Sequence, residues 1–258
     1  MNPIFAAGAV GHDRTLWLSY GTLIAATALA WWRTIMRPMS AGDMAGMGMT
    51  MAPSFGDAVS YVTAWAVMMA AMMLPSALPM IALFAATRRT ASPGARLAAV
   101  TLFSLVYLLV WALTGVPIYL ASLPLMAVQA STLAWIMAAV LVAAGLFQFS
   151  SLKRVCLRHC RSPLGFLLAR GRAGWRGALL LGWDHAVYCL GCCWALMVVL
   201  VVAGAMGLPW VLLIACLVAA EKVLPRGEWI ARIVGVALVL AGLAVALRPG
   251  LAAPLRGM

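Results

Sequence analysis

Three cysteines follow a histidine within two helical turns in the segment Trp183–Trp194, which reads Trp-Asp-His-Ala-Val-Tyr-Cys-Leu-Gly-Cys-Cys-Trp. On an α-helix, positions 185, 189, 192 and 193 share one face, because their offsets are 0, 4, 7 and 8. Imidazole and thiolate are the ligands that Cu(I) and Zn(II) prefer. A single cysteine also packs well as a small hydrophobe, but three thiols beside a histidine favour metal binding. We therefore predict a primary metal site formed by His185, Cys189, Cys192 and Cys193.

Ionisable residues accompany this cluster in or near apolar segments. Such groups are costly in lipid, so they usually face a bundle interior, where they pair or serve a pathway. Asp184 or Glu221 is predicted to hydrogen-bond the His185 ring and fix its tautomer. For Glu221 and Lys222 the alternative is a place at the membrane interface, with the lysine snorkelling to water.

A methionine-rich run offers neutral soft ligands that need no deprotonation to bind Cu(I). Its members also suit plain core packing, because methionine fills irregular gaps. The helical rise per residue places them at the depth of the cysteines. They are therefore predicted to complete the primary site, and they are Met68, Met69, Met72 and Met73, with Met80 following on the same side.

A second methionine-rich segment lies in the predicted outer loop, residues 37–56. Five methionines occur between Met39 and Met51, separated by glycine and other small residues that cannot form a core. A flexible outward segment of this kind suits capture of Cu(I), with Asp43 as an additional ligand. The alternative is a low-complexity linker that dips into the interface. The residues predicted to capture metal are Met44, Met47, Met49 and Met51.

A third group, Cys156, His159 and Cys160, lies in the predicted basic cytoplasmic loop, residues 151–176. Its spacing fits half a site on a helix, but two or three ligands are too few for structural zinc. The alternative is an amphipathic interfacial segment whose arginines hold phosphate headgroups. Cys216 stands alone and is predicted to be packing.

The elements that position these groups follow from composition. Of the 258 residues, 66% are apolar and only 9% are charged, whereas soluble domains carry about a quarter charged residues. This excludes a soluble enzyme, a disordered chain and a disulfide scaffold. The expected fold class is all-α, a single integral membrane domain over residues 1–258, and no signal peptide is expected before the first span. About seven transmembrane spans are predicted, or six if the weakest (208–224) is not counted: 15–36, 57–87, 97–121, 132–150, 177–203, 208–224 and 229–247. Pro75 and Pro79 predict a tilt or kink in the second span.

Basic residues set the predicted orientation. With a cytoplasmic N-terminus, 14 lysines and arginines fall in cytoplasmic segments and four outside. The formal charge of +12 is spread between apolar runs, so the lipid bilayer, not nucleic acid, is the expected partner.

The segments 148–163, 185–197 and 221–225, with the Met-Met-Ala-Ala-Met-Met-Leu-Pro-Ser run, resemble a bacterial family of predicted metal-binding integral membrane proteins, a domain of unknown function. The likeness covers about residues 55–247, and its combination of motifs is specific. It implies a multi-pass protein of the bacterial cytoplasmic (inner) membrane that binds metal.

The leading hypothesis is therefore a membrane protein that binds a soft transition metal and transports it, delivers it, or helps assemble another membrane or periplasmic metalloprotein. Copper, as Cu(I), is the expected ion and zinc the second candidate. No Gly-x4-Gly-Lys-Ser/Thr motif is present, so the protein is not its own ATPase-driven pump. The alternatives are a thiol-disulfide oxidoreductase using Cys189 and Cys192, and a structural subunit of a membrane complex. The buried position predicted for the cysteine pair disfavours an enzyme.

Overall fold

The computed structural model describes residues 14–36, 54–88, 90–126, 128–171, 174–203 and 207–255. All regular elements in these ranges are helices, as the composition predicts. They are α1 (Arg14–Met36), α3 (Phe55–Thr87), α4 (Pro93–Leu113), α5 (Gly115–Met126), α6 (Ala130–Phe147), α7 (Ser151–Arg161), α8 (Pro163–Arg170), α9 (Gly174–Val202), α10 (Leu208–Val223), α11 (Gly227–Leu247), the short 3-10 helix η3 (Pro249–Leu251) and α12 (Ala252–Leu255).

Five of the described helical segments are long and apolar enough to cross a membrane: Phe55–Thr87, Pro93–Leu125, Ala130–Phe147, Gly174–Val202 and Gly227–Leu247. The second of these joins α4 and α5. Helix α10 has only 16 residues, and the apolar part of α1 is the stretch Leu23–Met36. The total of seven spans therefore stays a prediction.

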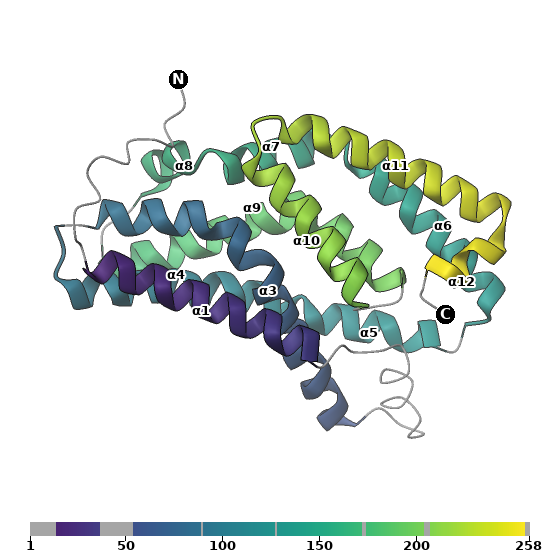
Figure 1. Ribbon diagram of the computed structural model, residues 1–258, viewed down its shortest axis with the longest axis horizontal. Helices are drawn as coiled ribbons and strands as arrows, with labels where there is room; N and C mark the ends of the chain where they lie inside the picture. The colour runs from purple at the N-terminus through teal and green to yellow at the C-terminus, as the bar shows by residue number, and fades with distance from the viewer. Residues whose placement is uncertain are drawn as a thin grey trace.

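Local sequence signals explain where several helices begin. Ser54 and Asp57 form a capping box at the start of α3, in which each side chain accepts from the other residue's backbone N–H. Ser92 precedes Pro93 at the first turn of α4, and Ser150 accepts from the Lys153 N–H at the start of α7. Helix α3 continues through Pro75 and Pro79 as one helix, and its ribbon bends part-way along (Figure 1).

The core lies where α3, α4 and α9 meet, with α7 and α10 closing it (Figure 1). Helix α9 is buried on most of its circumference, which agrees with an apolar character all round. At Gly182 a Cβ would lie 2.7 Å from the Phe103 carbonyl oxygen, so glycine is what lets α9 and α4 approach this closely. The Trp65 indole donates to the Thr114 hydroxyl at 3.0 Å and ties α3 to the junction of α4 and α5.

Candidate metal centre

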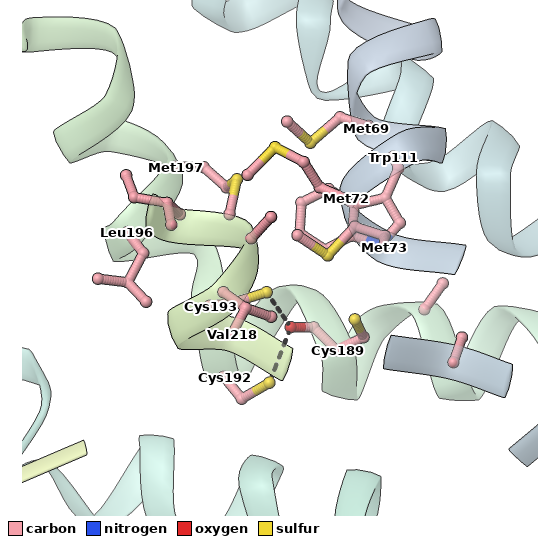
Figure 2. Packing of buried hydrophobic residues seen from close by; sticks show 14 of the residues in the cluster. Met69, Met72, Met73, Trp111, Cys189, Cys192, Cys193, Leu196, Met197 and Val218 are labelled. Atoms are coloured by element: carbon pink, nitrogen blue, oxygen red, sulfur yellow. Dashed lines mark hydrogen bonds between the residues drawn. The ribbon is translucent and has the colours of Figure 1, made fainter. Parts of the chain in front are cut away.

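The thiols of Cys189, Cys192 and Cys193 lie halfway along α9 and are at most 1% exposed. Around them Figure 2 shows Met69, Met72 and Met73 of α3, Trp111 near the end of α4, and Val218 of α10. Two of these thiols converge on one backbone group, the carbonyl of Cys189. Cys192 Sγ and Cys193 Sγ donate to the carbonyl oxygen of Cys189 at 3.1 and 2.9 Å, and the Cys189 thiol lies on the other side of that carbonyl (Figure 2).

The Cys189 thiol has a polar surrounding inside the apolar core. Lys222 Nζ lies 2.9 Å from Cys189 Sγ, and Tyr107 Oη lies 3.1 Å from the same sulfur. The Lys222 ammonium also donates to the Ser76 hydroxyl at 3.2 Å. Helices α3, α4, α9 and α10 thus contribute one residue each. Lys222 is 8% exposed. The structure therefore places it in the core, and not at the membrane interface, which was the alternative position considered from the sequence.

Cys160 of α7 joins the cluster from outside α9. Its sulfur lies 3.9 Å from Cys192 Sγ, and Cys156 packs where Gly191 leaves room, since a Cβ at Gly191 would lie 2.7 Å from the Cys156 sulfur. The sequence grouped these two cysteines with His159 as a possible site in the basic loop, and in the structure both sulfurs lie against α9. The chain between α6 and α9 folds α7 back onto α9, which brings the two groups together. Only His159 turns elsewhere, stacking on Tyr188 with ring centroids 4.3 Å apart.

Burial and neighbouring sulfurs control the protonation of the α7 thiols. Hydrogen bonding to Cys189 and Cys192, followed by burial, raises the pKa of Cys160 well above its usual range. Burial, then the charge of Cys192, raises the pKa of Cys156. Both groups are therefore neutral thiols at neutral pH, and metal binding by either must release a proton.

Ion pairs fix α7 in this position. Lys153 Nζ lies 2.6 Å from Glu221 Oε2, and both side chains are almost fully buried. Arg161 donates to the backbone carbonyls of Glu221, Leu224 and Pro225 at the end of α10. Such pairs hold one arrangement firmly, since removing one partner strands a buried charge. The sequence did not anticipate the lysine–glutamate pair, because it joins residues 68 positions apart.

The predicted methionine ligands line the same core. Met68, Met69, Met72 and Met73 are each at most 2% exposed, so none of them faces lipid. Figure 2 shows Met69, Met72 and Met73 extending from α3 toward Met197, Cys193 and Cys189 of α9. Tyr107 Oη, which contacts the Cys189 sulfur, also lies 3.5 Å from the Met73 carbonyl oxygen. Met197, which is 2% exposed, adds a thioether that the sequence had not singled out.

His185 lies in an aromatic pocket one turn before the thiols. Its ring centroid is 5.4 Å from that of Tyr107, 5.9 Å from Phe103 and 5.8 Å from Phe166. Among the described residues its Nδ1 has no hydrogen-bond partner. The carboxylates expected to hold it bind other groups, because Asp184 points around α9 to Arg170 at 2.9 Å and Glu221 is paired with Lys153. Consecutive residues on a helix do not share a face, which explains why Asp184 and His185 separate.

Across the described ranges, no three side chains of the histidine, cysteine, aspartate or glutamate type are arranged to hold a metal together. His185, Cys189, Cys192 and Cys193 therefore line one core without forming a finished four-ligand cage. All six cysteines are free thiols. A structural zinc ion takes four such ligands, whereas this core offers sulfurs in pairs, with thioethers beside them. Met44, Met47, Met49 and Met51 lie outside the described residues.

Residues 62–245 match the sequence model of the PpoB2 family, which is described as "Copper chaperone". The match runs from within α3 to near the end of α11 and includes every residue of the centre described above. This description agrees with copper as the expected metal and with the metal-related part of the resemblance. No curated protein and no solved structure matches the chain.

Proposed function

We propose, from the premise that the chain belongs to the PpoB2 family of copper chaperones, that it is a membrane protein that binds Cu(I) at the buried thiols of α9 and hands it to another metalloprotein. Here copper is the cargo of the protein. The function needs a site that holds the ion tightly enough to collect it and loosely enough to release it.

The observation that carries the proposal is the sulfur pair formed by Cys192 of α9 and Cys160 of α7, with the sulfurs 3.9 Å apart. For comparison, two sulfurs bound tetrahedrally at about 2.3 Å to zinc lie about 3.8 Å apart. A metal ion can thus bridge such a pair with little movement of either helix. Thiolates and thioethers select Cu(I) over harder ions, and methionines of α3 line the same core.

In this proposal Lys222 compensates the negative charge of the copper-loaded thiolates. A Cu(I) ion held by two thiolates carries one net negative charge, and burying that charge without a partner is unfavourable. The Lys222 ammonium, 2.9 Å from Cys189 Sγ, supplies the compensating positive charge inside the core. The copper-loaded cluster is then close to neutral overall. Ser76 holds the ammonium in place from α3.

The arrangement of donors suggests a route for the ion. Met44, Met47, Met49 and Met51 would capture Cu(I), the α3 methionines would pass it to the α9 thiols, and Cys160, which is less buried than Cys192, would present it for release. Exchange between neighbouring sulfurs is reversible, so the chain of donors can work in either direction. An ion released at Cys160 would pass to a membrane metalloprotein, whereas in the reverse direction the methionine-rich segment would pass it to a periplasmic metalloprotein.

The proposed setting is the bacterial cytoplasmic membrane, with seven spans and a cytoplasmic N-terminus. The supporting facts are the five long apolar segments and the excess of basic residues in the segments assigned to the cytoplasm. In this orientation α7 and the turn between α10 and α11 lie on the cytoplasmic side.

Metal analysis of the full-length protein, purified anaerobically and loaded with Cu(I), tests the proposal. The double variant Cys192→Ser with Cys193→Ser should lose tight copper binding, and Cys160→Ser should bind more weakly than the parent. Cys216→Ser is the matched control, because that thiol is exposed and not buried in the core, and it should bind as the parent does. Full copper binding by the double variant, with its fold verified by circular dichroism, would refute the proposed site.

A further inference from the structure

A cavity of about 350 Å³ opens beside α7. The end of α6, one side of α7 and the first turns of α11 form its walls. Its lining combines polar, charged and apolar groups: Gln148, Phe149, Lys153, Arg154, Leu157, Glu228, Ala231 and Arg232. None of these residues belongs to the proposed copper cluster.

The inner wall of this cavity carries an unsatisfied amide. Gln148 is 2% exposed, and neither its Nε2 nor its Oε1 has a hydrogen-bond partner in the described part of the chain. Buried amides are nearly always paired, because an unpaired one loses its hydration without compensation. A side chain with two free polar atoms that lines a cavity of this size points to a polar ligand there.

The charges around the cavity specify the sign of that ligand. Lys153 is neutralised by Glu221, and Glu228 is paired with Arg158 at 3.0 Å. Arg154 and Arg232 remain, and neither forms a salt bridge with any described residue. Both are exposed, and the Arg232 guanidinium is held over the Trp229 ring at 5.1 Å. Two guanidinium groups beside an amide suit a phosphate group, which arginine binds with paired N–H donors.

The surroundings of the cavity distinguish a lipid from a soluble phosphate. Phe149 lines the cavity and is 43% exposed, while Ile233 and Val236, on the outer side of α11, are 66% and 50% exposed. Leu240 continues this apolar strip along α11 at 61% exposed. A headgroup in the cavity would thus have its acyl chains on a surface that already suits them. Basic pockets at the ends of transmembrane helices are known to hold anionic headgroups.

We propose that this cavity binds the phosphate headgroup of an anionic phospholipid, with Arg154, Arg232 and Gln148 as its ligands and the acyl chains lying along α11. The inference is independent of copper, because none of the lining residues belongs to the proposed copper cluster. The lipid is part of the bilayer on the side to which the basic loop is assigned.

Native mass spectrometry of the full-length protein in detergent tests this site by titration with phosphatidylglycerol, phosphatidylcholine and inorganic phosphate. Phosphatidylglycerol should bind at least about tenfold more tightly than phosphatidylcholine, because the two arginines repel the choline cation that phosphatidylcholine carries beside its phosphate. The variant Arg154→Gln with Arg232→Gln should remove this preference. Arg248→Gln makes the same change on an exposed arginine at the other end of α11 and should retain it. Copper stoichiometry should be unchanged in all of them.

Gln148→Leu provides a second variant that is expected to fold, because it removes an amide that has no partner in the described residues. It should weaken phosphatidylglycerol binding by several-fold. A double arginine variant that keeps the parent's lipid preference would overturn the site. Displacement of phosphatidylglycerol by inorganic phosphate at equal concentration would overturn the lipid assignment, since a soluble anion would then suffice.

Discussion

Two helix contacts in this molecule use glycine for opposite purposes. Between α6 and α11, a Cβ at Gly145 would lie 2.7 Å from the Gly235 carbonyl oxygen, so the absent side chains let two antiparallel backbones touch. Between α7 and α9, Gly191 leaves space that the Cys156 sulfur fills. The first contact is apolar packing of the kind that drives helix association in lipid. The contact between α7 and α9 places sulfur donors beside buried charged side chains. Burying such charges is unfavourable, and a contact that served only for packing would not need them.

The two regions also differ in how their helices face the surroundings. Helix α11 exposes a continuous apolar side, including Ile233, Leu240 and Leu247. Helix α9 is buried along nearly its whole middle, and the polar groups of the core converge on it. The difference fits the proposal, in which α6 and α11 maintain the bundle and α9 carries the metal-binding thiols. Substitutions in each region should therefore affect different measurements.

The largest effect is expected from the glycine contact. Gly235→Ala places a Cβ 2.8 Å from Gln148 Cβ and 2.9 Å from the Gly145 carbonyl oxygen, and overpacking of this kind costs about 1–3 kcal/mol. Thermal unfolding in detergent should show the loss. Gly94→Ala is the matched control, because its Cβ would meet nothing within 4 Å, and it should not destabilise. Equal stability of the two variants would contradict the close-contact role of Gly235.

Much of this division was predictable from the sequence. Hydrophobic runs located the five long apolar segments, and helical periodicity placed Cys189, Cys192 and Cys193 on one buried face. These two predictions succeed because the length of an apolar run and the helical face of a residue depend only on neighbouring positions in the sequence. The match in depth between the methionine run and the cysteines also followed, since the rise per residue is fixed.

The contacts that complete the centre were not predictable in this way. Lys222 and Cys189 are 33 positions apart, and whether the lysine reaches the core or the interface depends on how α10 packs. The fold-back of α7, which brings Cys160 to Cys192, is accompanied by the Lys153–Glu221 pair and by the Arg161 hydrogen bonds to the end of α10. The local signal that pointed to a buried partner was the position of Glu221 and Lys222 at the end of an apolar run. Nothing in that segment indicated that Lys153 is the partner of Glu221. For His185, helical periodicity predicted the face of α9 on which it lies, but not the aromatic rings that surround it.

A smaller effect, confined to copper binding, is expected when the buried ammonium is removed. Lys222→Met keeps an unbranched side chain in the core, and a neutral Cys189 thiol can rest against a thioether without a stranded charge. The copper-loaded cluster loses its compensating charge, so Cu(I) affinity should fall about tenfold, or about 1.4 kcal/mol. Competition with a chromophoric Cu(I) chelator measures the change. Lys222→Arg keeps the charge and should retain more of the affinity than Lys222→Met. Parent-like affinity in Lys222→Met would remove the charge argument.

The smallest effect is expected when methionine is replaced by leucine, a change that can be made both beside the thiols and in α6. Met72→Leu with Met73→Leu preserves apolar bulk on α3 and deletes two thioether sulfurs beside the thiols (Figure 2). Because thioethers bind Cu(I) more weakly than thiolates, affinity in the chelator competition should fall only a few-fold. Met137→Leu makes the same replacement in α6, where the methionine is equally buried at 1% exposed, and should leave affinity unchanged. If both variants bound copper as the parent does, the α3 methionines would be packing residues like Met137, and the thiols alone would hold the ion.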